Sequence, residues 1–257
     1  MANAKKTLMS LIKSKKEEMP LNEAFLNDLK TVIMQLNPPR KPSKTYKPSS
    51  MNCARNMYFQ IVGAEVDSSV TDPFLSRICE CGTDSHERIQ NYVSKMQECG
   101  IDCEWVDPEQ YIKDKGLTHI KVTGKRGFET HCYIESLNIS FMCDGIIRYR
   151  GKYFIFEIKT EPDNKGLTRE EADPKHRRQS ICYSIGFNID DILWYYEERN
   201  YCIPKTFITH ISNEDKDEII GLIQYVDNCV VSQSPPPKTD QKRLCTYCNY
   251  KSECKKW

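Results

Sequence analysis

Residues 139–160 read ISFMCDGIIRYRGKYFIFEIKT, two runs of strand-forming residues joined at Arg150 and Gly151. β-Branched and aromatic residues favour strands, and a glycine-containing pair between two such runs favours a hairpin turn. Alternate residues of a strand face the same side, so Glu157 and Lys159 should point together. The hairpin can bring Asp144 beside Glu157. The stretch therefore predicts paired strands that gather two carboxylates and one ammonium.

Charges inside such an apolar strand are costly unless they are paired or solvated in a cleft. Two carboxylates at a strand end suit Mg²⁺ or Mn²⁺, which prefer oxygen ligands. Such a cation polarises a phosphate, and Lys159 can orient the water or stabilise the charge that develops. Taken singly, each residue has an ordinary structural interpretation, such as a turn cap or a surface charge. The combination points to a metal-dependent nuclease.

The rest of the chain alternates between helical and strand periodicity. Apolar spacing predicts helices over 1–36, 51–63, 74–98, 170–186 and 215–229, the last capped by Asn213-Glu214-Asp215. Alternation predicts strands over 118–136, 139–149, 152–159, 192–196 and 205–211. We therefore expect an α/β fold with a mixed central sheet flanked by helices.

Proline-rich segments divide the chain into three expected parts. Residues 37–50 hold four prolines and four basic residues and are expected to be an exposed linker. We expect a helical extension and basic linker over 1–47, a core over 48–231 and a cysteine-containing segment over 232–257. The N-terminal part could bind a protein partner or simply cap the core.

Composition indicates a globular protein of 257 residues with 39% hydrophobic and 28% charged residues. The longest apolar runs are too short to cross a membrane, and the first residues lack a signal peptide, so we expect an intracellular protein. Net charge is +1, which says nothing about partners. Local basic runs at 40–47, 175–178 and 242–256 would suit a phosphate backbone, although solvated basic surfaces are common.

Three of the 13 cysteines form the tight series Cys245-x2-Cys248-x5-Cys254. Such spacing supplies three metal ligands and leaves a fourth position for a distant residue. Four thiolates hold either zinc or an iron–sulfur cluster, and spacing alone leaves both open. Cys79, Cys81, Cys99 and Cys103 form the rival ligand set.

Four motifs stand in a particular order: Gly82-x3-His86, Asp144-Gly145, Glu157-Ile158-Lys159 and Gln179-x3-Tyr183. Residues 49–257 resemble the RecB-like branch of the PD-(D/E)XK nuclease superfamily, in which these motifs occur in this order. One departure is Phe141, which stands where that branch usually has glycine. The resemblance implies a restriction-endonuclease-like core. It implies a cation held by His86, Asp144, Glu157 and the backbone carbonyl of Ile158, with Lys159, Gln179 and Tyr183 completing the catalytic set.

The motif Cys53-Ala-Arg55 extends the resemblance to the iron–sulfur members of this branch, such as the CRISPR-associated exonucleases and the AddB nuclease domain. It implies a [4Fe–4S] cluster on Cys53, Cys245, Cys248 and Cys254, with zinc as the alternative. Joining positions so far apart in the chain would stabilise the fold by about 4–5 kcal/mol, by analogy with a cross-link.

The expected function is a Mg²⁺- or Mn²⁺-dependent deoxyribonuclease, an exonuclease on single strands or duplex ends. The resemblance implies DNA recombination, replication or CRISPR-type processing, and a bacterial virus or mobile element as a source. Alternatives are an endonuclease, an RNA-directed nuclease, or a non-catalytic nucleic-acid-binding assembly subunit. The residues expected to contact DNA are Arg55, Lys175, Arg177 and Arg178.

Overall fold

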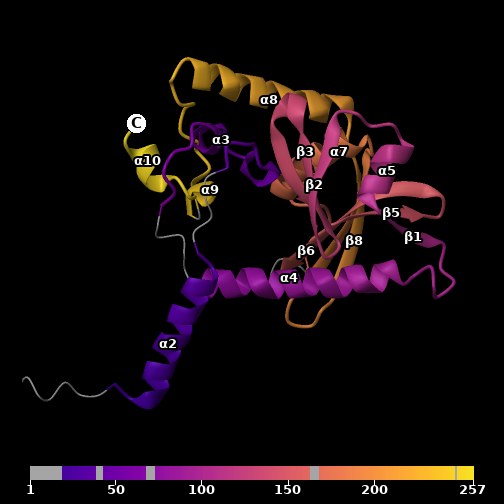
Figure 1. Cartoon of the computed structure of the whole chain (residues 1–257), viewed down its shortest axis with the longest axis horizontal. Coiled ribbons are helices and arrows are strands. Elements are labelled where there is room, and N and C mark those ends of the chain that lie inside the picture. Colours follow the sequence, from indigo (N-terminus) through magenta and orange to yellow (C-terminus); the bar gives the residue numbers. More distant parts are fainter. Residues whose placement is uncertain (1–18, 39–42, 68–72, 163–167, 247) are drawn as a thin grey trace, which may run out of the picture.

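Two β-sheets meet at Asp144, where strand β4 (Ile139–Cys143) passes into strand β5 (Gly145–Tyr149). The structure, a computed structural model, describes residues 19–38, 43–67, 73–162, 168–246 and 248–257. The helix expected over residues 1–18 therefore lies outside the described residues. One sheet has five strands and the other has three, and helices flank both (Figure 1).

The five-stranded sheet has the order β1-β5-β6-β7-β8. Its other strands are β1 (Cys103–Val106), β6 (Lys152–Glu161), β7 (Asp191–Glu198) and β8 (Pro204–His210). Strands β6 and β7 run parallel, whereas every other neighbouring pair is antiparallel. The predicted α/β class with a mixed central sheet is therefore confirmed.

The hairpin predicted at Arg150-Gly151 joins β5 to β6. Arg150 has φ 50° and Gly151 has φ 79°, while Tyr149 pairs with Lys152 across the turn. Positive φ at both turn residues matches the twist of the flanking strands. This two-residue turn fixes the register that sets β6 against β5.

The second sheet is an antiparallel meander of β2 (Ile120–Arg126), β3 (Glu129–Ile134) and β4. The sequence indicated one alternating run over 118–136. In the structure this run is two strands, because the chain turns at Gly127, where φ is 58°. The turn brings Glu129 to the beginning of β3.

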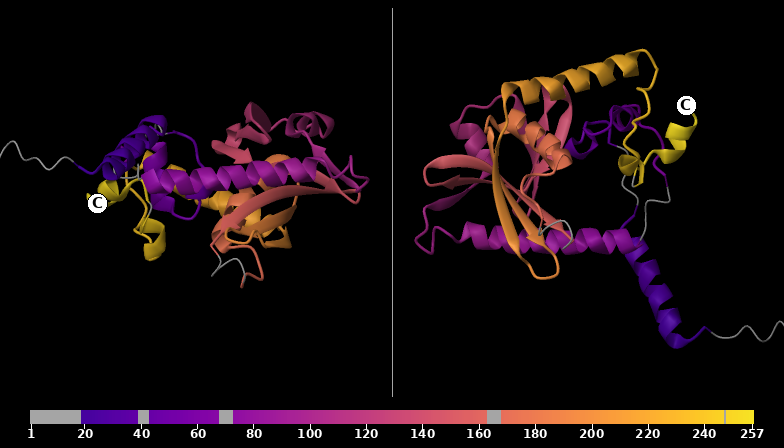
Figure 2. Two further views of the ribbon diagram at one scale, coloured as in Figure 1. Left: turned by 90° about the horizontal axis from the view of Figure 1, so that it is seen from below. Right: turned by 180° about the vertical axis from the view of Figure 1, so that it is seen from behind.

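The two faces of the five-stranded sheet are covered by different helices (Figures 1 and 2). Helix α4 (Pro73–Ser94) covers the face that carries Phe154, Phe156 and Ile158. Helix α7 (Pro174–Phe187) connects the parallel strands β6 and β7, and its apolar residues join the core that contains Ile155. The predicted alternation of β6 is therefore confirmed.

The remaining helices lie outside these layers. They are α2 (Leu21–Leu36), η1 (Pro48–Ser50), α3 (Ala54–Ile61), α5 (Pro108–Asp114), η3 (Glu135–Leu137), α8 (Asn213–Val231), α9 (Lys242–Thr246) and α10 (Lys251–Lys255). The N-cap of α8 is Ser212, which forms a capping box with Asp215, so the cap predicted at 213–215 is wrong by one residue. The helix itself is confirmed.

The linker predicted over 37–50 is wrong in its second half. Tyr46 is only 1% exposed, and its hydroxyl donates to Asp227 Oδ1 at 2.6 Å. Its backbone bridges to Ile139 at the beginning of β4. Burial of the large aromatic ring of Tyr46 is favourable, and its hydroxyl has a hydrogen-bond partner. The segment therefore joins the core although its sequence is basic and rich in proline.

The C-terminal segment packs against α3, far from it in sequence. Figure 1 shows α3, α9 and α10 gathered at one side of the molecule, and Figure 2 shows the same grouping from behind. The rings of Phe59 and Tyr250 lie 6.0 Å apart. Among the described helices, none is long and apolar enough to cross a membrane.

Candidate metal-binding active site

Asp144 lies at the junction of the two sheets, with three elements around it. Its Oδ2 accepts a hydrogen bond from the backbone amide of Ile158 at 2.8 Å. Its Oδ1 lies 3.3 Å from Nδ1 of His86, which comes from α4. Pairing of β5 with β6 starts at Gly145 and Phe156, so the register continues to Asp144 opposite Glu157. The expected juxtaposition of the two carboxylates is therefore present.

Close packing holds the backbone at Asp144. The amide of Gln90 donates to the carbonyl oxygen of Asp144 at 2.7 Å. A Cβ on Gly145 would lie 2.3 Å from Cη2 of Trp105, a distance that atoms do not reach. Any side chain directly after Asp144 would therefore have to displace the indole ring of Trp105, so glycine suits this position.

Glu157 is 1% exposed and forms an ion pair with Lys159 through Oε1. Its other oxygen, Oε2, is buried and has no hydrogen-bond partner among the described residues. Burial, followed by the charge of Asp144, raises the pKa of Glu157 to about 7, although Lys159 opposes this. A buried carboxylate oxygen without a hydrogen-bond partner is costly, and a cation bound by Glu157 would offset that cost.

The neighbouring groups favour their charged forms despite burial. Burial alone would raise the pKa of Asp144, but His86 and Lys159 outweigh it and hold that pKa below its ordinary value. Burial would lower the pKa values of His86 and Lys159, but the adjacent carboxylates raise both. The site is thus a set of mutually stabilising charges enclosed by protein.

The backbone of Ile158 faces the same place. In a β-strand the N–H and C=O of one residue point to the same edge. Since the amide of Ile158 points at Asp144, its carbonyl is directed to that edge of β6 as well. Beyond Phe156 no described strand pairs with this edge. The predicted carbonyl ligand therefore has a suitable orientation.

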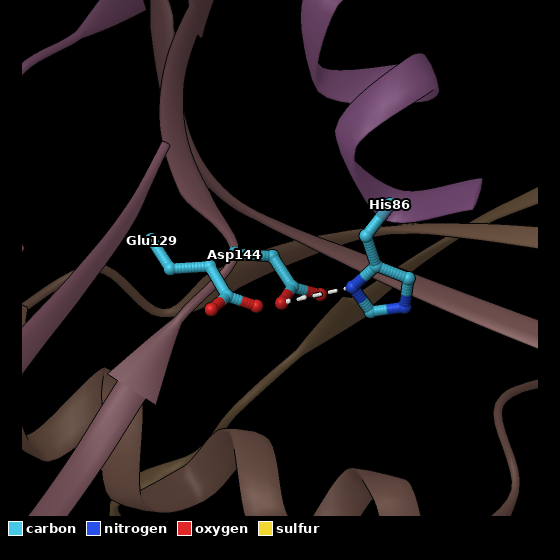
Figure 3. Close-up of side chains that lie close together, drawn as sticks. All are labelled: His86, Glu129 and Asp144. Atoms are coloured by element: carbon cyan, nitrogen blue, oxygen red, sulfur yellow. Dashed lines mark ion pairs between the residues drawn. The ribbon is translucent and has the colours of Figure 1, made fainter. Parts of the chain in front are cut away.

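Glu129 is a further acidic residue that the sequence interpretation missed. One ligand atom each from His86, Glu129 and Asp144 lie within 4.8 Å of one another (Figure 3). Pairing of β3 with β4 reaches Thr130 and Cys143, so Glu129 continues this register opposite Asp144. The sequence signal that could have revealed Glu129 is Gly127, because a turn at this glycine begins a new strand at Glu129.

Gln179 and Tyr183 lie on α7, and the amide of Gln179 donates to the Tyr183 hydroxyl. Burial and the charges of Glu157 and Asp144 raise the pKa of Tyr183 well above its ordinary value. Phe141, which departs from the family motif, is buried with its ring 5.0 Å from that of Tyr183. The departure therefore packs β4 against α7 and leaves the charged groups in place.

The residues predicted to contact DNA have mixed surroundings. Arg177 makes a two-point ion pair with Asp215, and Arg178 pairs with Glu218, so both join α7 to α8. Lys175 is exposed, and its ammonium has no partner among the described side chains. Lys175 is therefore the one lysine or arginine of residues 175–178 that has no acidic partner among the described residues.

Arg55 is not on a DNA-facing surface, contrary to the prediction. It is 5% exposed, and its Nη1 donates to the carbonyl of Pro236 at 2.6 Å. Its Nε and Nη2 are buried without a described partner. The guanidinium lines a cavity together with cysteines, and burial keeps it from reaching a nucleic acid.

This cavity has a volume of about 150 Å³ and is lined by all four cysteines of the predicted set. They are Cys53, Cys245, Cys248 and Cys254. Burial raises the pKa of Cys53, and the thiols of Cys248 and Cys245 raise it further. The predicted convergence of one early and three late cysteines is therefore present in the structure.

The rival cysteine set is separated. Cys81 lies in the first half of α4, whereas Cys99 follows the end of that helix. A helix rises about 1.5 Å per residue, so roughly 20 Å separates Cys81 from the end of α4. Cys79, Cys81, Cys99 and Cys103 cannot share one metal.

Comparisons with known proteins give only distant structural similarity. No family model and no curated protein matches the sequence. A solved structure designated SSO0001 superposes with a TM-score of 0.49 at 15% identity, covering 92% of this chain and 97% of its own. An alkaline exonuclease from Laribacter hongkongensis gives 0.39 at 9% identity, covering 75% and 90%. Both TM-scores lie below 0.5, so the functional argument rests on the site.

Proposed function

We propose that this protein is a divalent-metal-dependent nuclease that hydrolyses phosphodiester bonds in DNA. One observation carries the proposal: the unpartnered buried oxygen of Glu157 lies beside Asp144, whose own oxygens face His86 and the Ile158 amide. A structural ion pair would satisfy these groups internally. An enclosed acidic set with one oxygen left over suits a cation.

The donor set fits Mg²⁺ or Mn²⁺. Carboxylate oxygens and a backbone carbonyl are ligands that both cations accept, and the imidazole of His86 is tolerated by Mn²⁺. Asp144, Glu157, His86 and the carbonyl of Ile158 would hold the ion. When bound, it neutralises charge on the phosphate and makes an attacking water more acidic.

The other polar groups then act on the substrate. The Lys159 ammonium, held in place by Glu157, can orient water or stabilise the charge that develops on the phosphate. The hydroxyl of Tyr183 accepts a hydrogen bond from Gln179, and Glu157 and Asp144 are near enough to influence it, so this pair would support the acidic groups.

A groove beside α4 offers a path for a DNA strand. It has a volume of about 440 Å³, and its lining includes Arg77, Ser85 and Arg199. Arg199 Nε donates to the hydroxyl of Thr160, which follows the catalytic Lys159 on β6. The lining also includes Glu197, which pairs with Arg88, so its charge is balanced and the arginines of the groove can face a phosphate backbone. Lys175 would add a further phosphate contact beside α7.

An exonuclease acting on single strands or duplex ends remains our preferred form of this activity, in DNA processing such as recombination, replication or CRISPR-type reactions. The test uses single and double strands labelled at the 5′ or 3′ end, with Mg²⁺, Mn²⁺ or a chelator. Stepwise shortening from one end supports an exonuclease. Internal cuts in closed circular DNA indicate an endonuclease. DNA binding without cleavage would refute the proposal in favour of a non-catalytic assembly subunit.

We propose further that the four cysteines hold a [4Fe–4S] cluster, which ties the C-terminal segment to α3. The unpartnered Nε and Nη2 of Arg55 support an anionic group in their cavity. Zinc, held by the same four thiolates, is the alternative, and metal analysis of the purified protein separates the two.

A further inference from the structure

The turn between β2 and β3 carries an aromatic side chain at its tip. Arg126 pairs with Glu129, so Gly127 and Phe128 form a two-residue turn, with φ 58° at Gly127. Tips of such turns usually carry small polar residues. Phe128 is instead partly buried, and its ring lies edge-to-face with that of Trp105, with the ring centroids 5.3 Å apart.

Both neighbours of the Phe128 ring place it beside the acidic site. Trp105 comes from β1, and its Cη2 would lie 2.3 Å from a Cβ at Gly145, the residue after Asp144. On the other side, Glu129 follows Phe128 in the chain and turns its carboxylate toward Asp144 (Figure 3). A nucleotide next to a phosphate bound at Asp144 is therefore within reach of this ring.

The groove beside α4 and the aromatic pair lie on opposite sides of His86 along that helix. Arg77 and Ser85, which precede His86, line the groove. Ile89, which follows His86, belongs to the apolar cluster against which Trp105 packs. Because α4 runs straight past the sheet (Figure 1), a strand that follows the groove and crosses the acidic site meets the aromatic pair next.

The surroundings of Phe128 suit a nucleotide. Among the described residues, Phe128 is part of neither apolar cluster of the core. Arg126, two residues before it, is exposed and takes part in none of the ion pairs between described residues. Lys125, in contrast, is bound to Asp107 and Glu109. An aromatic ring beside an exposed guanidinium can hold a base and its phosphate together.

We propose that Phe128, supported by Trp105, stacks on the unpaired base of the nucleotide next to the scissile phosphate, while Arg126 contacts a phosphate of the same strand. This inference rests on the proposed nuclease function. Stacking on an aromatic ring tolerates any sequence, because every base has a π face. A base within a duplex is already stacked on its neighbours, so the tip of the β2–β3 turn selects a single-stranded end.

Binding of short single strands to the cleavage-inactive variant Glu157→Gln tests the proposal by fluorescence anisotropy. The strands are intact or carry an abasic nucleotide at the 5′ or at the 3′ end. One of the two abasic strands should bind about tenfold more weakly than the intact strand, as expected for one lost base–aromatic contact. Phe128→Ala in the same background should lose the same factor on the intact strand and nothing further on that abasic strand.

Two other substitutions separate stacking from anchoring of the turn. Phe128→Leu keeps an apolar contact with Trp105 but has no ring, so it should lose affinity as Phe128→Ala does. Phe128→Tyr keeps the ring and should bind the intact strand like its parent. Tyr225→Ala is the control, because Tyr225 is an aromatic residue on α8 that is 44% exposed, and its removal should change nothing.

The subsite is overturned when Phe128→Leu binds the intact strand as tightly as its parent, or when loss of the base costs the same with and without the ring. Cleavage by the wild-type protein with Mn²⁺ is scored separately. Cleavage together with either of those results removes the subsite alone. The expected binding pattern without any cleavage removes the nuclease alone, and absence of binding to the intact strand removes both.

Discussion

The backbone amide of Ile158 donates to Oδ2 of Asp144 at 2.8 Å, and this contact ties the junction of the two sheets to the centre of β6. This hydrogen bond occupies Oδ2 of Asp144, and Oδ1 of the same carboxylate faces His86. The same bond turns the Ile158 carbonyl toward the site. This single hydrogen bond thus sets the orientation of two expected ligands, Asp144 and the Ile158 carbonyl. A substitution at Asp144 that keeps the bond should remove the cation without unfolding the protein.

Asp144→Asn and Glu157→Gln should each reduce Mn²⁺-dependent cleavage at least about a hundredfold, because an amide cannot supply the charge that holds the cation. The oxygen of the introduced asparagine amide can still accept from the Ile158 amide, so circular dichroism should remain that of the wild type. Glu104→Gln removes a partly exposed carboxylate paired with Arg148 outside the site; it is the control and should keep full activity. Substantial activity in either site variant would remove these residues from catalysis.

Lys159→Met should lower the cleavage rate and make cation binding depend more strongly on pH. Burial and Asp144 raise the pKa of Glu157 to about 7 in the presence of Lys159. Removing the ammonium raises that pKa further, so more of Glu157 is protonated at neutral pH. Mn²⁺ affinity measured by calorimetry should therefore fall near pH 7 and recover as pH rises. Equal affinity at all pH values would show that Glu157 does not bind the cation.

Tyr183→Phe and Gln179→Ala should reduce turnover by about tenfold, less than the acidic variants, since they orient other groups. Phenylalanine fills the same space beside Phe141, so stability should change little. Cleavage rate and DNA affinity are measured together. If the cleavage rate and the DNA affinity both stay at wild-type values, Gln179 and Tyr183 serve only the packing of α7.

The cysteine site should give a brown protein after anaerobic purification, with absorption near roughly 400 nm and about four irons per chain. Serine at Cys53, Cys245, Cys248 or Cys254 should remove the colour and destabilise the fold, because the long loop is no longer closed. Serine at Cys79 or Cys99, both exposed, should change neither. One zinc per chain in a colourless protein would keep the ligand set and replace the cluster.

The pair of Arg177 and Asp215 should stabilise the protein above about pH 4 and lose this effect in acid. The hydrogen bond from Arg177 outweighs burial and lowers the pKa of Asp215 from 3.8 to about 2. A lowered folded-state pKa contributes stability above the unfolded value, and that contribution disappears as pH falls through the folded value. Because Arg177 is partly exposed, we expect about 1 kcal/mol, measured as the difference in unfolding free energy between wild type and Asp215→Asn at pH 7 and near pH 2.

Local sequence patterns were sufficient to predict the strands around the hairpin, the alternation of β6 and the order of the motifs. These are properties of single elements: Arg150-Gly151 permits positive φ, and a period of two places Glu157 and Lys159 together. Helical periodicity likewise predicted α4, α7 and α8 to within a few residues. The pairing of Asp144 with Glu157 followed because a two-residue turn fixes the register on both sides.

Only the tertiary structure shows which residues that are far apart in the sequence lie in contact. Tyr46 is buried against Asp227 although its basic, proline-rich context suggested exposure, and Arg55, expected to contact DNA, lines the cysteine cavity. Arg177 and Arg178 meet acidic partners on α8 that no local pattern linked to them. Glu129 reaches Asp144 because a second sheet crosses the end of the first. Such contacts depend on packing between elements, whereas a sequence pattern records only the geometry within one element.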